Sequence, residues 1–438
     1  MNVAIIGTGD ARDFSTFRKL KSEAILDTDA VFLFIYNMSP SGCFKDTDVH
    51  YVKSDSELIG LCSDYSIDCA VVFNTNILFS PVMKDLYQVG MRIYGPSEQA
   101  IPLEKSKAFG KKIINEAGIK TPSSREFDIS ESLNKMLPEL MQNSSRWVVK
   151  SDFMLKDANI RTCIVKSVEQ AQEAIKAIDT QAKLEGSTSR ILLEEFVSGS
   201  ELSVHLFIST EGYTLIPPVR DYKKRYIDGE GLNTHGLGAI CASNFPLPLL
   251  VKIEEEIVAP LFQCMKKKQL IYTGVLYLGV ILTDTGLQLL EINVRPGNPE
   301  WISILSLMKS PLLQCIKNSI IGSHGSIIFH SNSISISRFI VSVRYPLIDN
   351  DTTIDVADNY LEHAHSLSID ISPENFFLER AGRYSIKDRA LCITLRGNDF
   401  LQIVEALDSY INRNFPKNVF SAWNVGFDFN REFLVGLR

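Results

Sequence analysis

The chain has 438 residues, of which 45% are hydrophobic and 22% are charged, and its formal net charge at pH 7 is −7. This composition is ordinary for a globular protein of about three domains, and the negative charge argues against non-specific nucleic-acid binding. No apolar stretch approaches the roughly 18 residues that predict a membrane span.

The eight cysteines form no C-x-x-C pair, so their spacing predicts neither a zinc site nor a redox dithiol. Free thiols in a reducing cytosol are expected. The first apolar run follows no basic region and is short, so we interpret it as a strand and not as a signal peptide. A cytoplasmic location is therefore expected.

Short apolar runs alternate with helical segments over the first hundred residues. The runs VAIIG at 3–7, AVFLFIYN at 30–37 and CAVVFN at 69–74 are each bounded by turn or polar residues. Such runs are typical of strands that are buried on both faces of a parallel sheet. A further run, RIYG at 92–95, leads into a segment at 96–118 whose periodicity predicts one helix ending at a glycine.

Residues 123–196 have the pattern of a small α+β unit. WVVKS at 147–151 and RTCIV at 161–165 predict a hairpin. Ser167 and a glutamine three residues later form a capping-box pattern, which predicts a helix that ends near Leu184. ILLEEF follows as a predicted strand.

The central part of the chain predicts strands around one long helix. ELSVHLFIS at 201–209 and YTLIPPV at 213–219 are strand patterns, and 250–269 predicts a helix whose last turn carries three lysines. YTGVLYLGVILTD at 272–284 and LQLLEINV at 287–294 are expected to pair through a short Asp-Thr-Gly turn.

The segment beyond about residue 330 predicts a separate α+β piece. Its strand patterns are SRFIVSVRYP at 337–346 and ALCITLRG at 390–397. Its helical pattern spans 399–415.

Polar side chains end the strand at 287–294. Glu291 and Asn293 are two residues apart, so both point to one face of the strand. Two neighbouring oxygen ligands suit a hard cation such as Mg²⁺, and Arg295 on the same face could bind phosphate or carboxylate. The alternative is a solvated polar strand end, and spacing alone leaves both open.

Two lysines and a strand hinge are further candidates. Lys150 ends a buried strand pattern and could bind a phosphate, whereas Lys107 on a helix is more often a solvated surface residue. In LLEEFVSGSELSV at 192–204, the apolar hinge and Glu201 could surround an adenine and a ribose. The alternative is an ordinary turn between two strands.

Four segments occur in a recognisable order. Together they resemble the ATP-grasp ligases, and most closely glycinamide ribonucleotide synthetase, which is also called phosphoribosylamine–glycine ligase. The likeness runs nearly end to end and includes the segment at 389–411. The four segments are YGPSEQAIPLEKSKAF, LLEEFVSGSELSV, RDYKKRYIDGEGLNTHGLGA and YTGVLYLGVILTDTGLQLLEINVRPGNPE.

This resemblance implies an α/β protein with the ATP-grasp fold. It predicts an N-terminal Rossmann-like domain at 1–97, an ATP-grasp domain at 98–328 and a C-terminal α+β domain at 329–438. The lid of the ATP-grasp domain would be about 123–196.

The resemblance also implies a role for each matching residue. The roles are ATP-phosphate binding for Lys107 and Lys150; the adenine hinge for Glu194, Phe196 and Val197; the ribose carboxylate for Glu201; binding of Mg²⁺ or Mn²⁺ for Glu291 and Asn293; stabilisation of the transferred phosphoryl group for Arg295; and arrangement of the acid substrate for Asp221, Asn233 and Thr234.

The implied activity is ATP-dependent ligation of a carboxylate to an amine. A carboxylate would attack the γ-phosphate of ATP, and the resulting acyl phosphate would be attacked by an amine, with release of ADP and phosphate. A closing lid would exclude water from that intermediate. The expected partners are small-molecule substrates, with neither nucleic acid nor membrane; a homodimer and a carrier-protein partner are both left open.

Several segments depart from the family pattern. The first turn is GTGDARDF at 7–14, a later loop is FNTNILFS at 73–80, and the lid loop at 151–163 contains no glycine. In NTHGLG, His235 replaces a glycine of the family pattern, and it either contacts the acid substrate or fills a surface turn. In GNPE at 297–300, Asn298 replaces an acidic residue of the family pattern.

These departures affect the substrate half more than the nucleotide half. We therefore interpret the chain as a ligase for an amino acid or a similar small acid and an amine that differ from those of the family. The alternatives are a true phosphoribosylamine–glycine ligase and a non-catalytic ATP-binding module.

Overall fold

The computed structural model describes residues 1–24, 29–36, 46–142, 144–155, 158–187, 189–225, 234–322, 326–347 and 352–435. Asn233, which the sequence associates with the acid substrate, lies outside these ranges. No helix in them is long and apolar enough to cross a membrane.

The N-terminal part is a five-stranded parallel sheet in the order β3-β2-β1-β4-β5, as the apolar runs predict. β3 was not predicted, because its four residues are mostly half-buried and form no apolar run. The elements are β1 (Asn2–Gly7), α1 (Ala11–Glu23), β2 (Ala30–Tyr36), β3 (Val49–Val52), α2 (Asp55–Asp64), β4 (Cys69–Val71), α3 (Thr75–Leu78), α4 (Val82–Gln88) and β5 (Arg92–Tyr94).

The single helix predicted at 96–118 is wrong, because the segment contains two helices, α5 (Pro102–Lys105) and α6 (Lys107–Glu116). Ser106 between them has extended backbone dihedrals, and its hydroxyl accepts from the N–H of Phe109. The Ser106 hydroxyl also donates to Asp152, at 3.0 Å, from the unit that follows. Gly118, with φ +72°, follows the helix as predicted.

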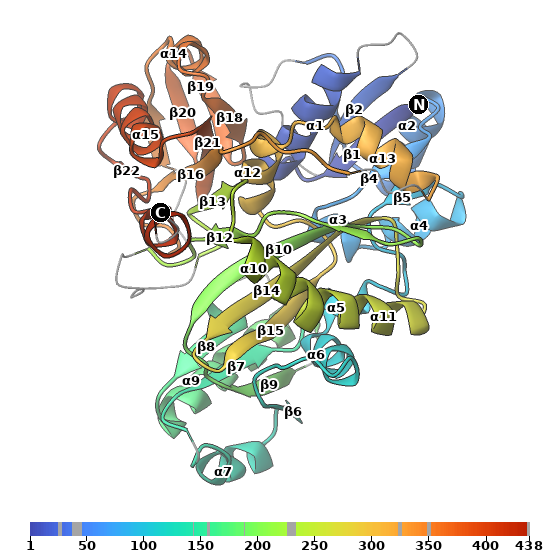
Figure 1. Ribbon diagram of the computed structural model, residues 1–438, viewed down its shortest axis with the longest axis vertical. Coiled ribbons are helices and arrows are strands. Elements are labelled where there is room, and N and C mark those ends of the chain that lie inside the picture. Colours follow the sequence, from blue (N-terminus) through green and yellow to red (C-terminus); the bar gives the residue numbers. More distant parts are fainter. Residues whose placement is uncertain are drawn as a thin grey trace.

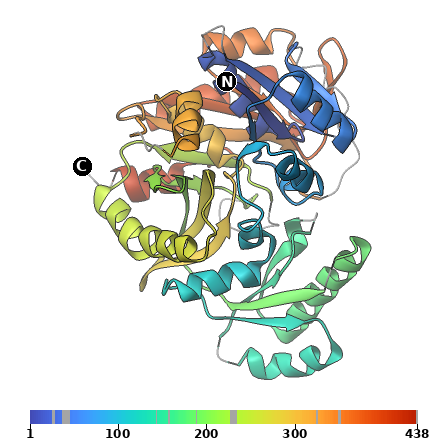
Figure 2. The same ribbon diagram turned by 90° about the vertical axis from the view of Figure 1, so that its right-hand side faces the viewer.

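The predicted small α+β unit is present as a lobe with its own apolar core (Figures 1 and 2). Its antiparallel sheet has the order β6-β9-β7-β8, and both the β7–β8 hairpin and the Ser167 cap are confirmed. The elements are β6 (Ser124–Asp128), α7 (Glu131–Leu140), β7 (Trp147–Ser151), α8 (Ala158–Arg161), β8 (Thr162–Val165), α9 (Val168–Leu184) and β9 (Arg190–Glu195).

The largest sheet runs through the rest of the molecule in the order β15-β14-β10-β12-β13-β16-β21-β18, with β11 and β22 attached at its sides. The predicted pairing of β14 with β15 is confirmed. The strands are β10 (Ser200–Ile208), β11 (Tyr213–Leu215), β12 (Val219–Asp221), β13 (Gly238–Ala242), β14 (Gly274–Thr283), β15 (Gly286–Asn293), β16 (Ile334–Ser342), β18 (Asp370–Pro373), β21 (Arg389–Gly397) and β22 (Val419–Phe420).

The helix predicted at 250–269 begins earlier and is not uniform. It consists of α10 (Leu247–Ile253), a π-helical segment η1 (Glu254–Val258) and α11 (Ala259–Lys267). Two further helices, α12 (Glu300–Leu307) and α13 (Leu312–Ile320), lead toward the C-terminal part.

The C-terminal part shares the largest sheet, because β13 pairs with β16 and β16 pairs with β21. It is therefore not a separate layer, and the boundary at residue 329 stays a prediction. A small sheet, β17-β20-β19, lies beside it (Figure 1). The remaining elements are β17 (Thr352–Asp355), α14 (Tyr360–Ser366), β19 (Phe376–Arg380), β20 (Arg383–Ile386), α15 (Phe400–Asn414), α16 (Phe427–Phe429) and η2 (Asn430–Val435).

Candidate active site

Lys107 and Glu291 meet between α6 and β15, although 184 residues separate them in the chain. The Lys107 Nζ lies 3.1 Å from Glu291 Oε2, and Asn293 Nδ2 donates to Glu291 Oε1 at 3.4 Å. The Lys107 ammonium holds the pKa of the Glu291 carboxyl well below its usual range, so this group is ionised at neutral pH. Glu291 and Asn293 share one face of the strand, as their spacing predicts.

A second cluster of charged side chains lies beside the first. Lys150 on β7 is 2.5 Å from Glu194 Oε1 on β9, and Lys111 is 2.7 Å from Glu194 Oε2. Lys111 was not predicted, although it lies four residues after Lys107 and therefore on the same helix face. Burial lowers the pKa of Lys111 to about 8. The three lysines and Glu291 line one narrow pocket between α6, the small lobe and β15.

Arg295 continues the polar face of β15 but is held by a partner that the sequence did not indicate. Its Nη2 lies 2.8 Å from Glu104 Oε1, and it also donates to Asn293 Oδ1 at 3.4 Å. Glu104 is buried on α5 and accepts from the N–H of Val294 at 2.9 Å. Since Glu104 has no periodic or motif signal, only the fold brings it to Arg295.

The predicted hinge connects β9 of the small lobe with β10 of the largest sheet. Phe196 donates its N–H to the Arg146 carbonyl at 3.3 Å, and the Arg146 guanidinium lies 4.1 Å from the centroid of the Phe196 ring. Val197 follows it, and Glu201 is exposed near the start of β10. Glu194 lies next to the hinge in the sequence, as predicted. Its side chain, however, pairs with Lys111 and Lys150.

Asp221 ends β12 on the other side of the site. Its side chain is 5% exposed, and Oδ2 lies 3.7 Å from the Nζ of Lys223, a residue that was not predicted. Burial raises the pKa of Asp221 to about 8. Its Oδ1 is buried without a hydrogen-bond partner within the described part of the chain, which is uncommon for a buried polar atom.

The NTHGLG segment packs against the GNPE turn. Gly236 has φ +96°, and a Cβ there would lie 2.8 Å from both Asp221 Oδ1 and Pro299 Cδ, so only glycine fits. His235 is exposed, and its N–H donates to the hydroxyl of Tyr345 at 2.9 Å. Thr234 is buried, and its hydroxyl donates to the Lys223 carbonyl at 2.7 Å.

The described residues contain no group of three or more His, Cys, Asp or Glu side chains that could hold a metal ion. The ionised Glu291 carboxylate and the neighbouring Asn293 oxygen nevertheless fit Mg²⁺. This ion commonly takes one or two protein oxygens and completes its shell with phosphate oxygens and water.

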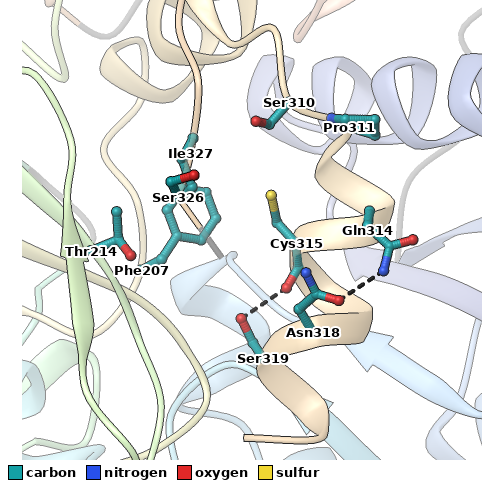
Figure 3. A pocket seen from close by; sticks show the side chains of 10 residues that line it. All are labelled: Phe207, Thr214, Ser310, Pro311, Gln314, Cys315, Asn318, Ser319, Ser326 and Ile327. Carbon is teal, nitrogen blue, oxygen red and sulfur yellow. Dashed lines mark hydrogen bonds between the residues drawn. The ribbon is translucent and has the colours of Figure 1, made fainter. Parts of the chain in front are cut away.

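A cavity of about 120 Å³ lies away from these residues, between α13 and the strands β10 and β11 (Figure 3). Neutral side chains line it, including Thr214, Gln314 and Asn318. Burial raises the pKa of the Cys315 thiol in its wall to about 11. Without a charged group, this cavity does not fit phosphate chemistry.

Comparison with known proteins identifies the fold. A family model described as phosphoribosylglycinamide synthetase, ATP-grasp (A) domain, matches residues 105–301, which include both charge clusters. This match identifies residues 105–301 as similar to an ATP-grasp domain. The chain resembles glycinamide ribonucleotide synthetase, as the order of its segments predicts.

Curated relatives carry the corresponding name. The chain is 28% identical to phosphoribosylamine–glycine ligase of Streptococcus pyogenes serotype M18 over 348 residues, which are 79% of this chain and 81% of the relative. It is 33% identical to the trifunctional purine biosynthetic protein adenosine-3 of Bos taurus over 282 residues, which are 64% of this chain and 27% of that protein.

Solved structures agree on the fold. Phosphoribosylamine–glycine ligase of Thermotoga maritima has a TM-score of 0.78 at 19% identity, with 97% of this chain and 100% of that chain covered. The biotin carboxylase domain of the Hydrogenobacter thermophilus 2-oxoglutarate carboxylase, solved with MgADP, has a TM-score of 0.71 at 13% identity, with 96% and 92% covered.

The predicted ATP-grasp α/β fold is therefore confirmed. ATP-grasp ligases of this kind are ADP-forming enzymes that use ATP and Mg²⁺ and make C–N bonds, and this chain is one of them. That assignment disfavours the alternative of a non-catalytic ATP-binding module. It covers ATP-dependent ligation of a carboxylate to an amine and leaves both substrates to be identified.

Proposed function

We propose that this chain joins an amino acid or a similar small acid to an amine through an acyl phosphate. The observation that carries the proposal is the contact of Lys107 with Glu291, with Asn293 on the same strand face. It combines a phosphate-binding cation with two oxygen ligands for a metal at one point between the small lobe and the largest sheet.

In the proposed reaction, a carboxylate oxygen of the acid bonds to the γ-phosphorus of ATP, and the bond to the β–γ bridging oxygen breaks to release ADP. The amine nitrogen then bonds to the acyl carbon. The acyl C–O bond breaks, phosphate leaves, and the nitrogen loses a proton. The acyl phosphate must be protected from water, which fits the position of the small lobe above the charged pocket.

The charged pocket would bind the phosphates of ATP. Lys107 and Lys150 would exchange their carboxylate partners for phosphate oxygens, and Lys111 would keep Glu194 paired. When bound at Glu291 and Asn293, Mg²⁺ would reduce the negative charge on the phosphoryl oxygens. Arg295, oriented by Glu104, would point its remaining N–H groups at the transferred phosphoryl group.

The hinge and the opposite wall would complete the site. Backbone groups of Phe196 and Val197 would bind the adenine edge, and the exposed carboxylate of Glu201 would accept from a ribose hydroxyl. Asp221, whose Oδ1 is buried without a described partner, would bind a donor group of the acid substrate. His235 would contribute to acid selection, and a similar place is proposed for Asn233.

We propose the domain boundaries 1–97, 98–328 and 329–438, with a lid at about 123–196. A cytoplasmic location is proposed too, in line with the free thiols of the described cysteines. A homodimer and presentation of one substrate by a carrier protein are alternatives, and sedimentation of the purified chain distinguishes a monomer from a dimer.

A second candidate is a true phosphoribosylamine–glycine ligase, which is the name of the relatives at 28% identity. Supplying phosphoribosylamine, glycine and Mg-ATP tests it directly. We expect little product, because the turn at 7–14 and the loop at 73–80 differ from the family pattern. Product formation with a kcat/KM of roughly 10⁴ M⁻¹s⁻¹ or better would favour this candidate over the first.

The main experiment is ADP release from Mg-ATP in the presence of paired panels of amino acids and amines. The proposal expects ADP formation that requires one acid and one amine, with the corresponding amide detected by mass spectrometry. The complete absence of coupled turnover over broad panels would contradict it. ADP release that requires an acid but no amine would support only the first half-reaction, formation of the acyl phosphate.

A further inference from the structure

The turn between β1 and α1 has the geometry of an anion-binding site, but the chain fills it itself. The N–H groups of Thr8, Gly9 and Asp10 all donate to Asp13 Oδ2, at 3.1, 3.1 and 3.2 Å. Successive backbone N–H groups at the start of a helix normally form a concave site for a phosphate or another anion. Here the side chain of Asp13, which is 0% exposed, occupies that position.

The local backbone is built around this carboxylate. A Cβ on Gly7 would lie 2.0 Å from Asp13 Oδ2, so only glycine at that position leaves room for it. Gly9 has φ +75°, which turns the N–H groups toward one point. Asp10 caps the same helix and accepts from the N–H of Asp13 at 3.0 Å, which completes a capping box.

The remaining donor at this turn is also taken by a carboxylate of the chain. The N–H of Ala11 donates to Glu374 Oε2 at 3.3 Å, and Glu374 itself pairs with Arg389 at 3.0 Å. The Arg12 guanidinium pairs with Asp10 at 2.9 Å. The carboxylates of Asp10, Asp13 and Glu374 thus surround the turn and accept the hydrogen bonds that a bound phosphate would need. Asp10 and Glu374 are also paired with arginines.

This turn lies next to the candidate active site. Arg12 Nη1 donates to the carbonyl of Pro296 at 2.6 Å, directly after Arg295 in the chain. Arg389 donates to the carbonyl of Asn298 at 3.0 Å, and Asn298 Nδ2 donates to Glu374 at 3.2 Å. A substrate that enters between the N-terminal sheet and the GNPE turn would therefore meet the filled turn.

We propose that Asp13 is a specificity residue, whose carboxylate closes the β1–α1 turn to phosphate and so excludes amine substrates that would place a phosphate group there. The amine is accordingly one without a phosphate at that position. This inference rests on the proposed ligase function. Its physical basis is that Asp13 and Glu374 occupy the N–H donors of the turn, while the Asp10 carboxylate beside it repels a phosphate.

The test measures binding, with the nucleotide site filled by a non-hydrolysable ATP analogue and Mg²⁺. Ribose 5-phosphate, inorganic phosphate and ribose are titrated calorimetrically into the wild type and into Asp13→Ala, Asp13→Asn and Asp399→Ala. Asp13→Asn keeps the turn filled without the charge. Asp399→Ala removes a carboxylate from another helix start, where it caps the exposed end of α15.

Asp13→Ala is expected to bind ribose 5-phosphate and inorganic phosphate roughly tenfold or more tightly than the wild type, and to gain nothing for ribose. The two other variants are expected to behave like the wild type. The melting temperature of Asp13→Ala should also rise with added phosphate, since the ligand replaces the lost acceptor.

The inference is overturned if the wild type binds ribose 5-phosphate as tightly as Asp13→Ala, or if a folded Asp13→Ala gains no affinity. Equal gains in Asp399→Ala would overturn it as well, since the effect would then be one of charge alone. If Asp13→Ala does not fold even with phosphate, the titrations of the wild type alone test the inference. Tighter binding of ribose 5-phosphate than of ribose would contradict it, and equal binding of the two would support it. None of these measurements requires turnover, so failure of the ligase assay is a separate result.

Discussion

The charged pocket at Glu291 and the β1–α1 turn both gather groups that attract anions, but they satisfy these groups in different ways. In the pocket, the donors are lysine side chains, and their partners Glu194 and Glu291 come from other elements. In the turn, the donors are backbone N–H groups, and their partner Asp13 belongs to the same helix.

This difference determines which of the two can accept a ligand. A lysine can rotate from a carboxylate to an ATP phosphate without disturbing the fold. Displacing Asp13 would break its half of the capping box at the start of α1 and take the acceptor from three backbone N–H groups before any new contact forms. An anion-attracting geometry therefore indicates a binding site only where its present partner can leave.

The charged pocket should be the more sensitive of the two regions, and Glu291→Gln tests this with the largest expected effect. Turnover measured as ADP release should fall about 10³-fold, because the proposed metal ligand and the charge beside Lys107 are both lost. The melting temperature should change little, since glutamine has the same shape. The exposed Glu255→Gln serves as the control, and near-normal ADP release from folded Glu291→Gln would remove the metal assignment.

His235→Gly examines the substrate side, where the chain departs from the family. If the exposed imidazole binds the native acid, kcat/KM for that acid should fall ~10–200-fold, equivalent to roughly 1–3 kcal/mol. Glycine as a substrate should lose less or gain. Equal responses for both acids, or none, would make His235 a residue of the surface turn only.

Lys150→Met tests the proposed nucleotide site by removing one proposed phosphate-binding lysine from the small lobe. Binding of Mg-ATP, measured by calorimetry, should weaken roughly 10–150-fold, because a hydrogen bond to a charged group contributes about 1.5–3 kcal/mol. Lys166→Met removes an exposed lysine from the same lobe and should have little effect. A similar loss in both variants would indicate a general effect of charge.

Asp221→Asn should have the smallest effect, which appears in the pH dependence of stability. The pKa of Asp221 is raised to about 8 in the folded chain, so the folded state binds more protons than the unfolded state between about pH 4 and 8. The wild type should therefore lose stability over this range relative to Asp221→Asn. In urea unfolding, the free energy of unfolding of the wild type relative to that of Asp221→Asn should fall between pH 5 and pH 8, by a few kcal/mol at most.

A constant difference between wild type and Asp221→Asn across this pH range would contradict that expectation. It would mean that Lys223, at 3.7 Å, keeps Asp221 ionised in the folded state. Substituting Asp399→Asn, on an exposed helix start, provides a control without burial.

Sequence reasoning succeeded where a local pattern decides the structure. The buried parallel strands, the Ser167 cap and the pairing of β14 with β15 each follow from apolar runs, turn residues or capping residues within a few positions. The common face of Glu291 and Asn293 followed from the two-residue period of a strand.

It failed where a distant segment decides the structure. The break at Ser106 depends on Asp152, which accepts from Ser106 and from the N–H of Ala108 at 2.7 Å. Glu104 became important only because β15 passes beside α5. Lys111 and Asp13 did carry local signals, a helical spacing from Lys107 and a capping box with Asp10, but these patterns are usually structural and gave no reason to place them at a site.

The continuity of the largest sheet has a practical consequence for dividing this protein. β13 pairs with β16 along five residues, and the fully buried Arg338 of β16 pairs with Asp408 of α15 at 2.5 Å. A chain shortened at residue 328 would leave β13 as an open strand edge with unpaired backbone groups, which promotes aggregation. Recombinant production of the nucleotide-binding part alone would thus call for retention of β16 and β21, not for a cut at the apparent domain border.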